Sequence, residues 1–289
     1  MFGLAVLFSL GAAAFLGAGL IASQYGLRHA PAWRAPVYSV PISALGVALT
    51  TPWTIDLAGW NTEAALLFAA VGAVFPVAVS FLTVESNARI GPSLTSALGN
   101  VAPVFAVLGA VLFLAESLSW GQAGGLALVV GGVVLMALRG VGVAASWPTW
   151  ILALPLLSAF VRGAVQPAIK AGLALWPDPW AATLIGYTVS SVVALALTHR
   201  RRRAAGPPDR RAVLWFCVQG LLNGTSTFLI YAALGIGSIA LVSPLVATYP
   251  LFALAFGVAM LKSERPGPRA LAGILVSVAG VIVLLLAAG

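Results

Sequence analysis

One stretch of the sequence decides the fold because it occurs twice. "VAPVFAVLGAVLFLAE" at 101–116 and "TYPLFALAFGVAMLKSE" at 248–264 carry a proline, a phenylalanine and a closing glutamate in the same order, with one added residue in the second copy. Internal similarity at a fixed distance marks a duplicated structural unit. Three further pairs of segments match in the same order: "YGLRHAP" (25–31) with "AGLALWP" (171–177), "EAALLFAAVG" (63–72) with "RAVLWFCVQG" (211–220), and "GLALVVGGVVL" (125–135) with "GILVSVAGVIV" (273–283).

The composition places this duplication in a membrane. The chain is 61% hydrophobic and 8% charged, whereas soluble domains carry roughly 25% charged residues. Apolar segments of about 20 residues are long enough to cross the bilayer as helices, and none alternates as a barrel strand does. We predict an all-α integral membrane protein with two five-helix repeats, residues 1–140 and 141–289. The ten predicted helices are 2–23, 36–54, 63–85, 92–115, 121–139, 148–172, 179–199, 212–234, 238–261 and 269–288.

An odd number of helices per copy predicts that the second repeat is inverted relative to the first, and the charges agree with this. Of the 15 Lys and Arg residues, thirteen fall in gaps that follow the first, third, fifth, seventh and ninth predicted helices. The other gaps hold acidic residues instead, such as Asp56, Glu116 and Asp178. By the positive-inside rule, the basic gaps lie in the cytoplasm and both termini lie outside. The basic run at 199–211 is expected to contact anionic lipid.

Two cations remain, both in the sixth predicted helix. Lys170 lies near the outer end, where a long side chain can reach the headgroups. Arg162 is deeper, about 14 residues or roughly 21 Å from the cytoplasmic end. A charge at the bilayer centre costs at least about 2.5–3.5 kcal/mol, so Arg162 is expected to face the interior of the bundle. It either holds a substrate carboxylate or binds backbone carbonyls that are freed near Pro155 or Pro167.

Other polar or helix-breaking residues are predicted at a similar depth. Breaks at membrane depth are tolerated where they line a cavity, and in transporters built from inverted repeats they cluster at the binding site. Each residue alone also fits a kink or an interhelical hydrogen bond. Together with Arg162, the candidate substrate-binding residues are Phe75, Pro76, Asn100, Pro103, Asn223, Thr227, Ser243, Tyr249 and Pro250.

Several other functions are disfavoured by the sequence. It contains no phosphate-binding Walker loop and no cluster of Cys, His and Asp with metal-ligand spacing, so we expect no ATP, metal or other cofactor. The basic residues lie between apolar segments, which argues against nucleic acid as a partner. An enzyme is disfavoured because the sequence shows no nucleophile–base pair. A monomer that binds membrane lipid and a small-molecule substrate is expected.

The ordered features resemble a known family over nearly the whole chain. Five plus five inverted helices, Pro103 and Pro250, closing glutamates at Glu116 and Glu264, and a glycine-rich fifth helix in each half look like the EamA branch of the drug/metabolite transporter (DMT) superfamily. Within it, the chain is similar to amino-acid exporters of the YddG type. The resemblance implies a transporter of the bacterial inner membrane. It implies export of small metabolites, most of all amino acids including aromatic ones, by alternating access through a central cavity.

One departure from the family pattern keeps other interpretations open. Relatives often carry an aromatic residue before the glycine of the first and sixth helices, where this chain has Leu16 and Arg162. Other cargo, such as drugs, nucleosides or sugar phosphates, is therefore an alternative, and so is a passive channel.

Overall fold

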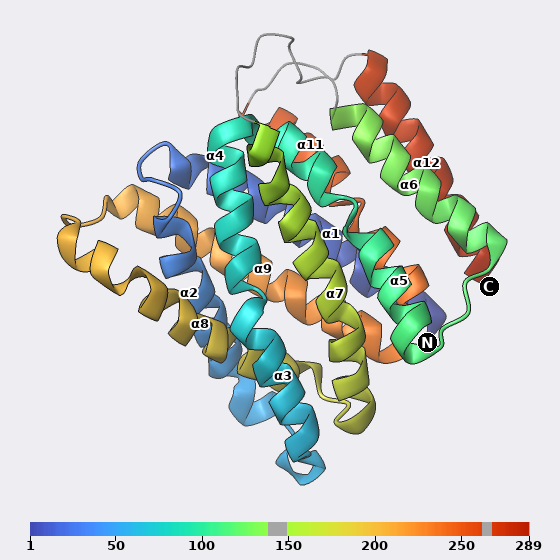
Figure 1. Cartoon of the computed structure of the whole chain (residues 1–289), viewed down its shortest axis with the longest axis horizontal. Helices are drawn as coiled ribbons and strands as arrows, with labels where there is room; N and C mark the ends of the chain where they lie inside the picture. The colour runs from blue at the N-terminus through green and yellow to red at the C-terminus, as the bar shows by residue number, and fades with distance from the viewer. Residues whose placement is uncertain (138–148, 262–267, 289) are drawn as a thin grey trace.

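A computed structural model describes residues 1–137, 149–261 and 268–288, and these residues form helices with no strand among them (Figure 1). Two 3-10 turns, η1 (Leu57–Gly59) and η3 (Thr149–Leu152), accompany the α-helices. The α-helices are α1 (Phe2–Leu27), α2 (Arg34–Thr54), α3 (Thr62–Val74), α4 (Val77–Gly99), α5 (Ala102–Leu114), α6 (Trp120–Ala137), α7 (Ala153–Leu175), α8 (Pro179–Ala204), α9 (Arg210–Ile236), α10 (Ile239–Val246), α11 (Tyr249–Leu261) and α12 (Pro268–Ala288).

The prediction for the third and fourth helices is wrong in its boundaries. A gap was expected around Arg89, between helices at 63–85 and 92–115, but α4 runs through this region without a break. Arg89 Nη2 lies 2.6 Å from Glu85 Oε1, one helical turn earlier, and an ion pair at this spacing stabilises a helix. The chain breaks at Phe75 and Pro76 instead, and again between α4 and α5.

The predicted position of Pro103 and Pro250 in the middle of helices is also wrong. Pro103 lies in the first turn of α5 and Pro250 is the second residue of α11. Proline is tolerated in a first turn because the backbone N–H that it lacks would have no partner there. The predicted helix at 238–261 is therefore two helices, α10 and α11, with a turn between Val246 and Tyr249.

The apolar length of the helices fits a multi-pass membrane protein, although the number of ten spans stays a prediction. Within the described residues, six helical stretches are long and apolar enough to cross a membrane, and α3 and α4 together supply one of them. Three shorter apolar helices lie in α5, α6 and α12. The six stretches are Phe2–Leu27, Thr62–Ile90, Trp150–Leu175, Pro179–Ala204, Arg210–Ile236 and Ile239–Met260.

The two ends of the bundle differ in charge. At one end, which we call the basic end, the Arg34 Nη2 donates a hydrogen bond of 2.8 Å to the carbonyl of Gly206, and His29 lies 3.8 Å from Asp209. This contact joins the end of α1 and the start of α2 to the connection between α8 and α9. At the other end, which we call the terminal end because α1 begins there, the Asp56 N–H donates to Asp178 Oδ2 at 3.2 Å. Gaps that were predicted to lie on the same face of the membrane thus meet in space.

Glycines bring helices of the two halves into backbone contact, and they do so in matching pairs. A Cβ at Gly17 of α1 would lie 2.7 Å from the backbone N of Ala253 in α11. A Cβ at Gly163 of α7 would lie 2.5 Å from the carbonyl oxygen of Ala102 in α5. The same contact is therefore made twice with the halves exchanged, which supports the repeat prediction. The limits of the repeats, 1–140 and 141–289, remain predictions.

The pair α6 and α12 shows the same exchange at the edge of the bundle, where the two helices lie side by side (Figure 1). A Cβ at Gly132 would lie 2.7 Å from the carbonyl oxygen of Gly273, and one at Gly280 would lie 2.9 Å from that of Gly125. Small residues such as glycine allow this kind of close helix approach in membranes. The structure shows close contact at Gly125, Gly132 and Gly280, whereas Gly124 and Gly131 face open space.

We expect Gly132→Ala to destabilise the protein and the adjacent Gly131→Ala to leave its stability unchanged or slightly raised. A Cβ at Gly132 would lie 2.5 Å from the backbone N of Ser277, whereas nothing lies within 4 Å of one at Gly131. Overpacking of this kind costs about 1–3 kcal/mol of unfolding free energy, while alanine favours a helix over glycine by about 1 kcal/mol. Thermal unfolding of the two purified variants in detergent measures the difference. Equal melting temperatures would contradict the α6–α12 contact.

A central cavity around Arg162

A cavity lies inside the bundle and extends from the middle of α1 towards the basic end. Its free space is about 90 Å³, enough for several water-sized groups because one water needs about 10–15 Å³. The lining is apolar around Leu16, Phe75 and Ile230, and it includes no acidic residue. The polar residues that line this central cavity are Ser23, Ser39, Ser43, Ser80, Thr83, Asn87, Thr95, Arg162, Tyr187, Gln219, Asn223, Ser226, Thr227 and Tyr249.

Arg162 is the only cation in this lining. It is half-buried on α7, next to Gly163, whose contact with α5 fixes its position. Its guanidinium carbon lies 5.7 Å from the centre of the Tyr249 ring at the start of α11, a cation–π distance. Among the described residues no carboxylate lies within ion-pair distance of it, since the ion pairs there use Glu85, Glu116 and Asp209. A charge at this place is therefore available to an anionic ligand.

Two amides that sequence reasoning missed also line the central cavity. Asn87 on α4 and Gln219 on α9 are each 5% exposed. Both amide atoms of Asn87 and the Oε1 of Gln219 have no hydrogen-bond partner in the part of the chain that the structure describes. Buried polar atoms without partners are rare and costly, so such atoms in a cavity wall indicate a bound ligand or water. A single amide in an apolar helix gives no periodic signal, and only its predicted depth could have singled it out.

Besides Arg162 and Tyr249, four predicted residues line the same cavity, and two of them make contacts within the protein. The Tyr187 and Thr227 hydroxyls are hydrogen-bonded at 3.0 Å. Asn223 packs against Gly19 of α1, where a side chain would collide with its Oδ1. Phe75 and Pro76 form the wall at the break between α3 and α4.

The remaining predicted residues lie elsewhere. Asn100, Pro103 and Ser243 line a second, smaller pocket with about 20 Å³ of free space, which we call the small pocket. Pro250 lines neither space. Arg162 and Tyr249 border both, so they separate the small pocket from the central cavity.

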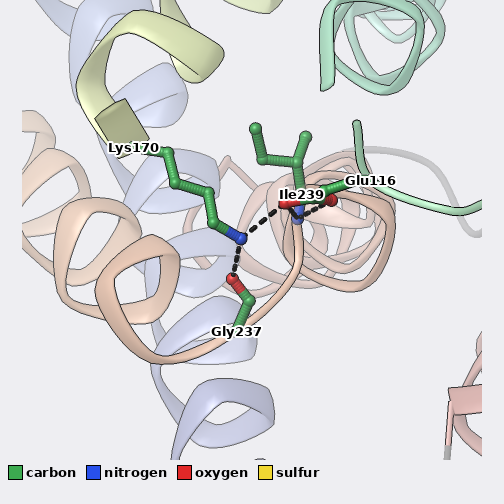
Figure 2. Close-up of polar contacts among 4 residues, drawn as sticks. All are labelled: Glu116, Lys170, Gly237 and Ile239. Atoms are coloured by element: carbon green, nitrogen blue, oxygen red, sulfur yellow. Dashed lines mark hydrogen bonds and ion pairs between the residues drawn. The ribbon is translucent and has the colours of Figure 1, made fainter. Parts of the chain in front are cut away.

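Lys170 does not behave as predicted. Instead of reaching towards the headgroups, its Nζ donates a hydrogen bond of 2.5 Å to Glu116 Oε1 and one of 2.8 Å to the carbonyl of Gly237 (Figure 2). Glu116 also accepts a hydrogen bond of 3.0 Å from the N–H of Ile239. The sequence could not predict this pairing because Glu116 lies in the connection between α5 and α6, 54 residues away.

The Glu116–Lys170 cluster, made of Glu116, Lys170, Gly237 and Ile239, joins three segments at the terminal end. The Glu116 carboxylate serves as the N-terminal cap of α10, whose own N-cap residue Ser238 makes no side-chain cap bond. The main hydrophobic core surrounds this end with Ile169, Leu173, Trp176, Leu234 and Ile239. The terminal end is therefore closed by charge and by apolar packing.

Within the described residues there is no group of three His, Cys, Asp or Glu that could hold a metal ion. Apolar helices that span a membrane, breaks beside a polar cavity and one uncompensated charge in its wall are features of membrane transporters. The chain belongs to the EamA-like transporter family, whose model matches residues 3–138 and again residues 148–286.

Solved structures show the same fold. One crystal structure is 15% identical in sequence and has a TM-score of 0.75, and the match covers 98% of this chain and 97% of that protein's chain. At this identity the likeness concerns the fold alone. The comparison with curated proteins gives no match.

We expect Gln219→Met to leave the melting temperature unchanged or raised, and Ser43→Ala to lower it. The Gln219 Oε1 has no partner, so an apolar side chain of similar size removes a desolvation cost. The buried Ser43 hydroxyl donates to the carbonyl of Gly220 at 2.6 Å, and losing it costs about 1 kcal/mol. Thermal unfolding of both purified variants in detergent measures these changes in melting temperature. A large loss of stability in Gln219→Met would show that the amide is structural.

Proposed function

We propose that this protein is a secondary transporter that exports small carboxylate-bearing metabolites, amino acids first among them, by alternating access. The bacterial cytoplasmic membrane is its proposed location, with ten spans in two inverted repeats and a monomer as the working unit. The observation that carries the proposal is Arg162, which lines the central cavity with no carboxylate partner among the described residues.

The electrostatics of the cavity favour an anionic group on the ligand. A guanidinium away from bulk water is costly unless a negative charge is nearby, and the cavity wall supplies none. Its planar donors match the two oxygens of a carboxylate. The hydroxyls and the amides of Asn87 and Gln219 can hydrogen-bond the polar parts of a ligand. A lipophilic cation, the cargo of many drug exporters, would instead be repelled.

The two ends of the bundle support alternating access. The central cavity extends towards the basic end through Ser23, Ser39 and Gln219, and the Glu116–Lys170 cluster closes the terminal end. The cavity and the cluster lie far apart along α1. Ala5 lies beside Gly237 of the cluster, and Ser23 of the cavity wall lies about 27 Å further along the helix at 1.5 Å per residue. With the basic end in the cytoplasm, the structure corresponds to a state whose cavity faces inwards.

Arg162→Ala should abolish saturable uptake of labelled amino acids into proteoliposomes while the purified protein stays monodisperse. The variant removes the one charge that can hold a substrate carboxylate. Arg201→Ala is the matched control, because it removes the same charge from an exposed position at the end of α8, where little effect is expected. Retained transport in Arg162→Ala would sink the proposal. Flux that never saturates would favour a channel, and competition by nucleosides or drugs alone would favour the other cargo.

Lys170→Met and Glu116→Gln should each weaken closure at the terminal end. Either change leaves a half-buried charge without its counterpart, which costs less than the roughly 3–5 kcal/mol of a fully buried pair but still weakens the contact. The test uses Ile239→Cys in a Cys217→Ser background. We expect this cysteine to react with a membrane-impermeant thiol reagent several times faster when either variant is present than in the parent. Gln122→Met, at the half-buried start of α6 where it removes only a hydrogen bond from the Ser119 N–H, is the control. Unchanged labelling in both variants would show that the cluster does not close this end.

A further inference from the structure

We propose that the small pocket is the subsite for the ammonium group of the transported substrate. This inference rests on the proposed function and narrows it from carboxylate-bearing metabolites to α-amino acids with a free primary amine. Arg162 borders both spaces. A substrate whose carboxylate contacts Arg162 can therefore place a neighbouring amine in the small pocket and its side chain in the central cavity.

Two side-chain oxygens in the pocket wall lack donors. Asn100 Oδ1 and Gln166 Oε1 are buried and have no hydrogen-bond partner among the described residues, and the two residues are only 1% and 9% exposed. Asn100 Nδ2 donates to the carbonyl of Ala247 at 2.7 Å, and Gln166 Nε2 donates to that of Arg162 at 3.4 Å. These bonds orient both amides with the oxygen free. The pocket thus offers acceptors and needs donors, which is what an ammonium group supplies.

Two helix ends add negative potential to the same place. The small pocket is lined by Gly99, the last residue of α4, and by Val246, the last residue of α10. The carbonyl ends of helices carry partial negative charge, and the ends of broken helices bind cationic groups in other inverted-repeat transporters. The Ser243 hydroxyl lies in the wall as well. Oxygen acceptors and helix ends therefore favour a positive group in this pocket.

The size and charge of the small pocket limit which chemical group it can bind. About 20 Å³ of free space holds a group the size of one water or ammonium, so an N-acyl group does not fit. A free metal cation is disfavoured because the Arg162 guanidinium borders the pocket. An amino acid avoids this repulsion, since its own carboxylate lies between its ammonium and the guanidinium. The pocket therefore matches the amine of a zwitterion better than an independent ion.

The test compares ligands that differ only in the amine. Leucine, phenylalanine and threonine are each measured beside the corresponding 2-hydroxy acid and N-acetyl derivative as inhibitors of amino-acid exchange in proteoliposomes. Wild-type protein should prefer the free amine by about tenfold or more, as expected when hydrogen bonds to a charged group are lost. Equal inhibition by the 2-hydroxy acids would overturn the proposal and show that the pocket holds water only.

Variants then locate the preference in the pocket. Gln166→Met should reduce the preference for the amine several-fold while inhibition by the 2-hydroxy acid stays the same, and Asn100→Leu should act likewise where it folds. Gln122→Met makes the same chemical change at the half-buried start of α6, where Gln122 Oε1 accepts a hydrogen bond from the Ser119 N–H, and should keep the preference. An unchanged preference in Gln166→Met would overturn the subsite. If no carboxylate of any kind inhibits the wild type, the proposed function itself fails, which is a separate outcome.

Discussion

The close backbone contact of Gly17 with α11 and of Gly163 with α5 is the constraint on which the rest of the structure depends. At each place the helix approaches the first turn of a broken helix so closely that a Cβ would collide with backbone atoms. Polar backbone at a helix break is tolerated in a membrane only inside the protein or beside a cavity. The contacts therefore bury both breaks in the bundle, and Arg162, which precedes Gly163, is held beside them.

The backbone contacts occur in pairs, but the polar side chains do not. The spacing that relates Gly17 to Gly163 also relates Leu16 to Arg162 and Gln24 to Lys170. Lys170 makes an ion pair at the terminal end, whereas the Nε2 of Gln24, nearer the basic end, has no partner among the described residues. In the proposed transport cycle, symmetric packing gives two arrangements of the halves similar energy, while the asymmetric charges decide which end is closed in one of them. The cavity accordingly extends towards the end where Gln24 takes the place of Lys170.

Sequence reasoning predicted the helices and the repeat from long apolar segments. It singled out Arg162 because a charge inside such a segment is unusual. It placed the breaks badly, since the Glu85–Arg89 pair keeps α4 helical where a loop was expected. The amides of Asn87, Gln166 and Gln219 were missed. Whether such a side chain finds a partner depends on contacts across the bundle, and no local pattern reports these. The same is true of Glu116 and Lys170.

The helix α10 connects the two regions that the proposed alternating access must coordinate. Its eight residues are all buried, and the Glu116 carboxylate binds its first N–H. Three residues after its last residue, Tyr249 faces Arg162. Lys170 and Arg162 are both on α7, two turns apart. Lys170 binds the carbonyl of Gly237 just before α10, and Arg162 faces Tyr249 just after it. A carboxylate that binds Arg162 competes with the Tyr249 ring for the same guanidinium. Under the proposed function, the occupancy of the cavity and the closure at Glu116 therefore act at the two ends of α10, which connects binding to opening.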